Sequence, residues 1–309
     1  MTLFDSTELI DEEVENVTAE LLALDPDGSR MARVFRGTFD QLYDGQRTGR
    51  YKIEQLFKTE KTHFGTLVEI NLQRELKFKD GDILDFKIAG NEVDCKYSHT
   101  GAWMLPMESF DEIVLVTQAD DHRSTWSAGV VRVAEQNRRT SVNRDKKTGL
   151  NALGRSRIRW VHKNAKMPPN TLLQLAPQVV DRIMSGRTGQ ARLNELFRSA
   201  KDKRIPRNVI ATVAQQNDFM KRVRDNGGSR GALRSEGILI LGGDYRIQRD
   251  LAVALGSEAP DPGELVSFEV VPADPGLGVE IDGNWWRHSK PGERATVPAP
   301  TLPRSRAKP

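Results

Sequence analysis

The sequence is poor in the residues on which several classes of protein depend. It has a single cysteine, Cys95, among 309 residues, so it can form no intramolecular disulfide and no cysteine-rich zinc site. Its five histidines are scattered and no H-E-x-x-H motif occurs, which disfavours a zinc enzyme. No run of eighteen apolar residues exists, so we expect no membrane-spanning helix. The acidic N-terminus shows no signal-peptide pattern, and together these absences predict a cytoplasmic protein.

The chain as a whole has little excess of either charge sign, but individual segments do. The net charge is only +3, which does not by itself indicate binding to nucleic acid. Residues 1–29 contain nine acids and no lysine or arginine. Residues 138–163 contain nine basic residues and one acid, and residues 201–234 contain nine and three. Such segments are what a phosphate-binding surface requires, although two solvated, charge-rich faces remain an open alternative.

The length and composition predict a globular protein of two domains. Hydrophobic residues make up 38% of the chain and charged residues 29%, and 309 residues suffice for two ordinary domains. The polar, proline-containing stretch near residue 164 has the composition of a boundary. Five prolines among the last twenty residues predict a flexible tail. The expected division is 1–163, a linker at 164–170, a second domain at 171–290 and a tail at 291–309.

The first domain has the pattern of a sheet flanked by helices. Apolar residues recur at helical spacing in 6–24, where Ser6 or Thr7 is a candidate N-cap, in 31–43 and in 51–76. Residues 113–117 and 126–133 read as strands. The polar loop at 44–50 carries Arg47 and Arg50, which could contact a phosphate backbone, or it is simply a solvated loop.

The second domain combines short helices with strands. Helical patterns cover 170–184, 190–201 and a segment opened by Pro206, which continues to Arg224 and is broken by glycines at 226–231. Strands are expected at 237–242, 265–271 and 279–281. A basic helix followed by a turn and strands suggests a winged helix–turn–helix. Similar elements also occur in small domains that bind no DNA.

The stretch from Asp85 to Lys96 is the part around which the chain is organised. It reads as two short strands joined by a turn at 89–91, where Gly and Asn tolerate the positive φ of a tight hairpin. Residues two apart on a strand point to the same face, so Asp94 and Lys96 lie about 6–7 Å apart along it. If the hairpin forms, Asp85 meets Asp94 from the neighbouring strand.

Two carboxylates and an ammonium on one surface suit phosphodiester hydrolysis. Carboxylates hold Mg²⁺, which stabilises charge on the phosphate and acidifies a bound water. A lysine can act on the attacking water or neutralise the transition state. Glu69, among apolar residues of the preceding helix, would be costly to bury unless it is paired or binds metal. By spacing alone, a surface hairpin with an incidental charge pair and a solvated helix-surface Glu69 are the alternatives.

Longer blocks of sequence carry a specific resemblance. The blocks are D-Q-L-Y-D-G-Q-R-T-G-R at 40–50, K-T-E-K-T-H-F-G-T-L-V-E-I-N-L at 58–72, V-D-C-K at 93–96, G-A-W-M-L-P at 101–106 and V-I-A-T-V-A-Q-Q-N-D-F-M-K-R-V-R at 209–224. Together they resemble the NaeI family of restriction endonucleases. The resemblance implies a bacterial type IIE enzyme with an α/β (or α+β) restriction-endonuclease-like core and a mixed sheet. A second domain, a winged helix similar to that of the catabolite activator protein, would follow.

The resemblance also implies partners and mode of action. Such enzymes are Mg²⁺-dependent homodimers that bind two copies of double-stranded DNA, one cleaved and one activating through the second domain. Members of this family act on a GC-rich palindrome of the GCCGGC kind. The implied function is sequence-specific cleavage of both strands, and we weigh it against two others. These are a non-catalytic DNA-binding regulator and a structure-specific repair nuclease.

The nuclease motif of the family, PD-(D/E)xK, maps onto individual residues. Asp85 and Asp94 match its two acids and would bind metal, helped by the backbone carbonyl of Cys95, while Lys96 matches the lysine that works on the attacking water. Glu69 matches the helix carboxylate of the NaeI-like site. Leu84 stands where the motif has proline, a loosely kept position. DNA contacts in the second domain are chosen by charge and position only, and they are Arg207, Lys221, Arg222, Arg224, Arg230 and Arg234.

Overall fold

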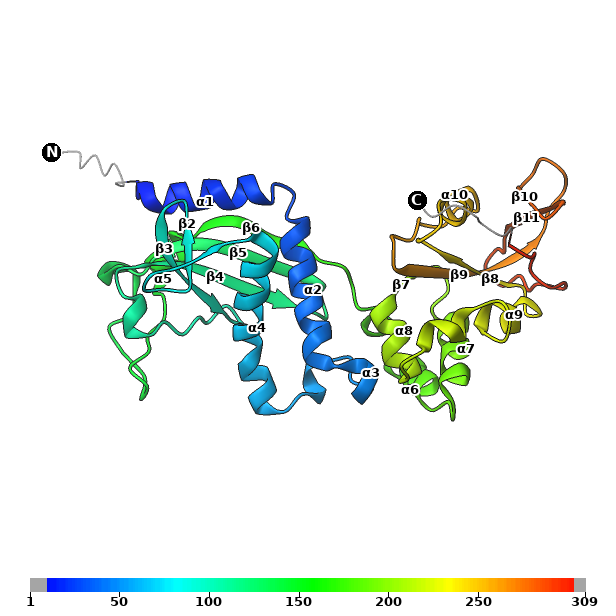
Figure 1. The fold of residues 1–309 in the computed structure, drawn as a ribbon, viewed down its shortest axis with the longest axis horizontal. Coiled ribbons are helices and arrows are strands. Elements are labelled where there is room, and N and C mark those ends of the chain that lie inside the picture. Colours follow the sequence, from blue (N-terminus) through cyan, green and yellow to red (C-terminus); the bar gives the residue numbers. More distant parts are fainter. Residues whose placement is uncertain (1–9, 303–309) are drawn as a thin grey trace. The chain divides into compact units, whose positions relative to one another are not determined.

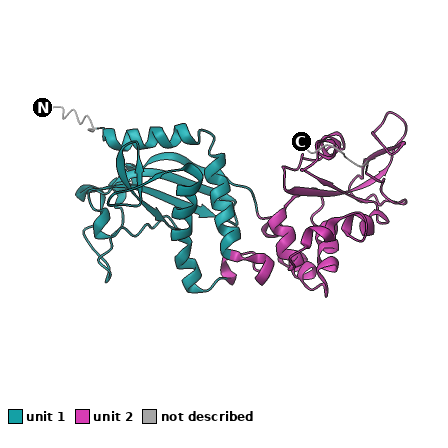
Figure 2. Cartoon of the chain, in the orientation of Figure 1, with its two compact units in different colours: residues 1–42, 56–169 teal, residues 43–55, 170–309 magenta. Residues whose placement is uncertain are grey.

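The chain folds into two compact units that do not follow the simple order of the sequence. The computed structural model describes residues 10–302. The first unit comprises Met1–Leu42 and Leu56–Pro169, and the second comprises Tyr43–Gln55 and Asn170–Pro309 (Figure 2). The chain therefore passes between the units three times. The segment 43–55, which the sequence alone would leave with the first domain, packs with the second.

The first unit is built on a six-stranded mixed sheet. The strands follow the order β1-β2-β3-β4-β5-β6, and β3 pairs with β4 in parallel while the other neighbours are antiparallel. The expected mixed sheet is confirmed. The strands are β1 (Lys79–Asp80), β2 (Phe86–Ile88), β3 (Asn91–Tyr97), β4 (Ile113–Asp120), β5 (Thr125–Arg132) and β6 (Arg159–Lys166).

Three long helices accompany this sheet: α1 (Glu12–Leu24), α2 (Ser29–Tyr43) and α4 (Lys58–Leu76) (Figure 1). The α1 helix is capped by Asp11, whose carboxylate accepts a hydrogen bond from the Val14 N–H at 3.2 Å. The candidate caps at 6 and 7 lie outside the described residues. The helix expected over 51–76 begins later, at Lys58. The Glu60 carboxylate accepts the Phe57 N–H at 2.8 Å and so caps the first turn of α4.

Apolar side chains fill both faces of the sheet. Phe39 of α2 stacks on Phe64 of α4 with ring centroids 4.6 Å apart, and Phe35 packs on Trp126 of β5 at 5.3 Å. A separate buried cluster combines strand residues with the connections that follow them, and it consists of Trp103, Leu105, Val114, Val116, Val131, Val133, Leu150 and Ile158. This cluster fixes the connections beside strand β3.

One strand of this sheet was missed by pattern reading. Residues 138–163 show no clear periodicity in the sequence, yet they contain the short helix α5 (Ala152–Ser156) and most of β6. In β6 only Val161 is buried, because the strand lies at the edge of the sheet and exposes its charged residues. Since β6 continues to Lys166, the expected linker at 164–170 begins too early.

The second unit packs helices against an antiparallel sheet. Strand β9 is central and pairs with β7, β8 and β11. The helices are α3 (Gly45–Thr48), α6 (Pro177–Met184), α7 (Gly189–Ser199), α8 (Arg207–Ala214), α9 (Ser229–Arg234) and α10 (Arg246–Ala254). The strands are β7 (Arg204–Pro206), β8 (Ile238–Gly242), β9 (Glu264–Pro272), β10 (Val279–Ile281) and β11 (Asn284–His288).

Details of the second unit correct three expectations. The helix opened by Pro206 ends at Ala214, because Gln215 has a left-handed φ of 51°, and residues 219–223 form a separate 3-10 turn. The helix expected from 170 likewise splits into a 3-10 turn and α6. The tail is not free over its described part. Ala299 is buried, and its N–H donates to the Arg234 carbonyl at 2.8 Å. Residues 303–309 of the expected tail lie outside the described residues.

Among residues 10–302, no helix is long and apolar enough to cross a membrane.

Candidate active site

The hairpin predicted around residue 90 forms and brings the two acids together. A two-residue turn joins β2 to β3, with positive φ at both Ala89 (50°) and Gly90 (83°), as a type I′ turn requires. The register pairs Phe86 with Val93, so Asp85 enters the hairpin opposite Asp94. The carboxylate of Asp85 accepts the backbone N–H of Cys95 at 2.7 Å. The local pattern of the sequence therefore sets the relative positions of both carboxylates.

The ammonium group of Lys96 lies where three oxygen groups converge. It forms an ion pair with Asp94, donates to the Cys95 carbonyl at 3.1 Å and lies 3.8 Å from the Asp85 carboxylate. Asp94 is buried, while Lys96 and Asp85 are partly exposed. The groups are thus held by the protein on one side and accessible on the other.

Negative charge exceeds positive charge at this point. Burial, the hydrogen bond with Asp94 and repulsion from that carboxylate raise the pKa of Asp85. Burial and the charge of Asp85 also raise the pKa of the half-buried Glu69. Burial lowers the pKa of Lys96, but the surrounding carboxylates outweigh it and leave a net increase. A further cation would relieve the repulsion.

The thiol of Cys95 takes no part as a nucleophile. It is buried, and burial raises the pKa of the thiol well above its usual value, so the side chain stays neutral. Only the backbone groups of Cys95 face the site.

Two supporting side chains were missed by sequence reasoning. The buried hydroxyl of Ser109 donates to the Asp94 carboxylate at 2.5 Å, and no spacing rule indicates a partner fifteen residues away. Glu92 accepts three consecutive backbone N–H groups, from Asp82 at 2.9 Å, Ile83 at 3.0 Å and Leu84 at 2.9 Å. It holds the loop that leads into Asp85. The acid-rich turn preceding the hairpin was the available signal for a carboxylate anchor.

The donor set fits a magnesium ion. Among the described residues there is no group of three or more His, Cys, Asp or Glu side chains arranged to hold a metal. Mg²⁺ does not need one, since it keeps several waters and is commonly bound by one or two carboxylates plus substrate phosphate. Asp85, Asp94 and the Cys95 carbonyl already surround one cation, the Lys96 ammonium.

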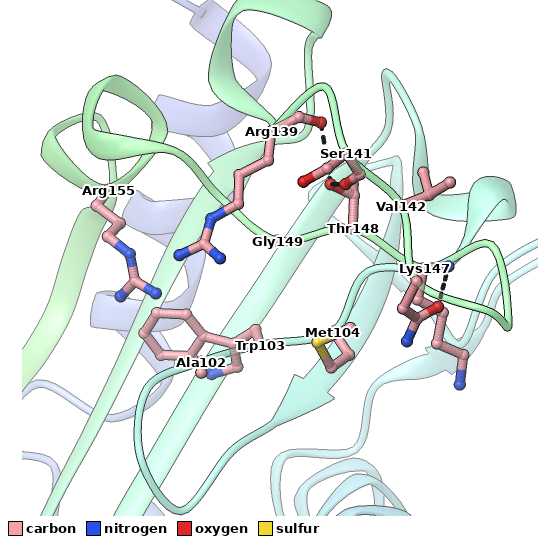
Figure 3. Close-up of a pocket in the computed structure, with 11 residues that line it drawn as sticks. Ala102, Trp103, Met104, Arg139, Ser141, Val142, Lys147, Thr148, Gly149 and Arg155 are labelled. Atoms are coloured by element: carbon pink, nitrogen blue, oxygen red, sulfur yellow. Dashed lines mark hydrogen bonds between the residues drawn. The ribbon is translucent and has the colours of Figure 1, made fainter.

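A basic cleft lies on the connections next to the catalytic strand. It has a volume of about 230 Å³ and is bounded by the loop after β3 and by residues 138–150, here called the basic arm. Figure 3 shows Arg139 and Arg155 directing their guanidinium groups toward Trp103 from two different segments. Leu105 and Thr148 exchange backbone hydrogen bonds at 2.8 and 2.9 Å and so attach the arm to the loop.

Arg47 and Arg50, the two DNA-binding residues expected in the first half of the chain, differ in their contacts. Arg47 is 83% exposed and pairs with Asp44 at 3.2 Å. Arg50 donates to the Tyr43 carbonyl at 3.2 Å and so partly supports its own loop. Both belong to the segment 43–55, which packs with the second unit.

The six positions chosen in the second unit divide into two groups. Arg207, Arg222 and Arg224 are exposed, and so is Lys221, which pairs with Asp218 at 3.4 Å. Arg230 and Arg234 instead line a pocket of that unit, and both are only partly exposed.

Acids and a lysine on a hairpin in a mixed sheet define a nuclease of the restriction-endonuclease class. A family model described as restriction endonuclease NaeI matches residues 15–297. The type II restriction enzyme NaeI of Lentzea aerocolonigenes is 49% identical over 311 residues, which cover 96% of each chain. The chain belongs to the NaeI family of restriction endonucleases. The resemblance read from the sequence is confirmed, and with it the enzyme class, a type II site-specific deoxyribonuclease.

Proposed function

We propose that this protein is a Mg²⁺-dependent enzyme of the bacterial cytoplasm that cuts both strands of DNA at a GC-rich palindrome of the GCCGGC kind. Water attacks phosphorus in line with the departing 3′ oxygen and leaves a 5′-phosphate and a 3′-hydroxyl. The observation that carries the proposal is the convergence of Asp94, Asp85 and the Cys95 carbonyl on the ammonium of Lys96.

Each group of the site has a role in this reaction. Asp85, Asp94 and the Cys95 carbonyl would hold the metal, and Mg²⁺ bound there would supply charge stabilisation at the phosphate and a more acidic water. The Lys96 ammonium, beside these oxygens, would orient the attacking water. Glu69 contributes a further carboxylate near the same point. Ser109 and Glu92 keep the two acids in place.

The basic arm supplies cations to the phosphates of the substrate. Asp94 and Lys96 pair in register with Val114 and Val116, which belong to the same buried cluster as Trp103. Neighbouring residues in adjacent strands point to one face, so the arm and the catalytic side chains share that face. Removing one cation that binds a phosphate should reduce the dependence of log affinity on log salt by about 0.9. Arg139→Ala should do this, and Arg123→Ala, on the remote turn after β4, should not.

The second unit is proposed to be a winged helix–turn–helix that binds the activating DNA. Its elements follow the order α7, β7, α8, α9, β8, β9, with β7 and β8 both antiparallel to β9. Helix, strand, two helices and two strands in this arrangement support a winged helix. Arg207, Lys221, Arg222 and Arg224 are the proposed DNA-binding residues. Arg47 and Arg50 of the segment 43–55 are proposed as further DNA-binding residues of the same unit.

Cleavage of both strands of a palindrome calls for two symmetry-related active sites, so we propose a homodimer. A dimer would bind two DNA sites, one at its two nuclease domains and one at its two second domains. Coupling between them has to be reciprocal, so that each DNA raises the affinity for the other. Equal cleavage rates for plasmids with one and two sites, at low enzyme concentration, would contradict this coupling.

The decisive experiment is plasmid digestion by the wild type and by Lys96→Ala, with Mg²⁺ and with EDTA. We expect discrete Mg²⁺-dependent fragments from the wild type, and from the variant DNA binding without cleavage. A DNA-binding regulator would show no cleavage in either protein, and Lys96→Ala would leave its binding unchanged. A structure-specific repair nuclease would cut without producing fixed bands. End-mapping of the fragments then names the recognition sequence.

A further inference from the structure

The second unit contains a cavity that no step of the proposed reaction uses. Its volume is about 540 Å³, within the range of small-molecule sites. It is open to solvent on one side and is lined by α9, β8, the start of α10 and the C-terminal segment at 300–302. The two partly exposed arginines, Arg230 and Arg234, lie in its wall.

Arg230 is the unusual member of the wall. Its guanidinium is largely buried and donates to the Gln248 side-chain oxygen at 3.1 Å. The same oxygen also accepts the Gly242 N–H at 2.8 Å, so its hydrogen-bonding capacity is filled. The Nε of Arg230 is shielded from solvent and has no hydrogen-bond partner among residues 10–302. Burial lowers the pKa of Arg230 and outweighs the charges of Asp225 and Asp244, which act on this guanidinium. A largely buried charge that forms no ion pair is costly, which points to a missing anion.

The remaining charges of the wall leave it positive. Arg234, one helical turn from Arg230, donates to the Ala299 carbonyl at 3.1 Å and adds a second guanidinium. Asp225, the acid that lines the cavity, is exposed at the rim. Asp244 accepts the Gly263 N–H at 2.8 Å and, with Asp225, acts on Arg230 through its charge without forming an ion pair with it.

The other side of the cavity is apolar and aromatic. Leu239, Leu302 and Tyr245 contribute surface of the kind on which a sugar or a base can pack. A guanidinium fork pairs with phosphate through two parallel hydrogen bonds. We propose that the cavity binds a nucleotide-sized ligand, with its phosphate on Arg230 and its base against this apolar wall.

Two kinds of molecule can supply such a nucleotide. One is a free deoxynucleotide, and the other is a nucleotide of a DNA strand bound to the second unit. The DNA source rests on the activating role proposed above, whereas the anion site itself does not. A loss of DNA activation would therefore leave the test with free nucleotide intact.

The experiment is thermal unfolding of the full-length protein with an equimolar mixture of the four deoxynucleoside monophosphates. Sodium chloride of equal ionic strength is the reference. At a ligand concentration about a hundred times the dissociation constant, we expect the unfolding temperature to rise by about 5–10 °C. A parallel sample receives a short duplex carrying the GC-rich palindrome instead.

The variant Arg230→Met separates a binding role from a structural one. Removal of an unpaired buried charge should leave the unfolding temperature in ligand-free buffer no lower than that of the wild type, while the response to ligand is abolished. The matched control is Arg246→Ala, because Arg246 belongs to α10 but is 83% exposed and pairs with Asp250. It should respond as the wild type does. If Arg230→Met does not fold, Arg230→Lys keeps the charge but not the fork and should respond about tenfold more weakly.

Each outcome decides the matter. An Arg230-dependent shift with mononucleotides supports the site with a free nucleotide as its ligand. An Arg230-dependent shift with the duplex alone supports the site with DNA as the source of the phosphate. The proposal is overturned if neither probe stabilises the wild type, or if Arg230→Met responds as strongly as the wild type.

Discussion

Replacement of Ser109 by alanine tests how Asp94, an acid proposed to bind the metal, is held. The Ser109 hydroxyl is fully buried and donates to the Asp94 carboxylate at 2.5 Å, while the Asp94 side chain is only 6% exposed. A hydrogen bond to a charged group contributes about 1.5–3 kcal/mol. If all of this energy serves to hold the carboxylate in its productive position, the cleavage rate should fall about 10–100-fold, at 1.4 kcal/mol per factor of ten.

The assay is initial-rate cleavage of a plasmid over a series of Mg²⁺ concentrations. Ser109→Ala should need more Mg²⁺ and should remain slower at saturation, because a misplaced Asp94 weakens the metal site. Ser109→Cys, which nearly keeps the volume but donates weakly, should lie between the two. Ser98→Ala is the control, since Ser98 lies in the same connection but its side chain hydrogen-bonds the Thr100 hydroxyl at 3.5 Å and the Thr100 N–H at 3.3 Å. Wild-type rates for Ser109→Ala at limiting Mg²⁺ would refute the reasoning.

Other parts of the structure allow three further predictions. In Glu92→Gln the loop before the hairpin has a weaker anchor, and plasmid digests should show slower cleavage and a higher Mg²⁺ requirement. Three backbone N–H groups lower the pKa of Glu92 to about 2. The contribution of its carboxylate to the free energy of unfolding is therefore complete above about pH 4.5 and is lost as the pH falls toward 2. Urea unfolding curves of the wild type and the variant should converge over that range. Asp121→Ala removes a buried carboxylate that pairs with the buried Arg36, and denaturant unfolding should show a loss of about 3 kcal/mol; a loss below 1 kcal/mol would contradict it. In Gly45→Ala the new methyl group would overlap the Thr212 hydroxyl of α8, so calorimetry should show destabilisation by about 1–3 kcal/mol.

The parts of the fold that local pattern determines could be read from the sequence. Helices α1, α2 and α4 each bury a stripe of apolar residues, and β4 is buried along nearly its whole length. Edge strand β6 could not be read, because only one of its eight residues, Val161, is buried and three are basic. The segment 43–55 could not be assigned either, because its place depends on packing against α8, far away in the sequence.

The candidate site shows the same division. The hairpin around Gly90 is a local structure, so its turn and the pairing of Asp85 with Asp94 could be predicted. Ser109 reaches Asp94 only through the path of a fifteen-residue connection, which no periodicity describes. The inward orientation of Arg230 likewise depends on a cavity wall assembled from distant segments. The role of Arg230 in DNA binding stays a prediction.

The threefold passage of the chain between its units has a consequence for engineering. In most two-domain enzymes one cut at the linker releases two separate modules, which can be recombined with others. Here a cut near residue 170 would leave 43–55 attached to the first unit and remove from the second unit a piece of its own core edge, where Tyr51 packs. Chimeras of this enzyme should therefore exchange the stretches 43–55 and 170–309 together.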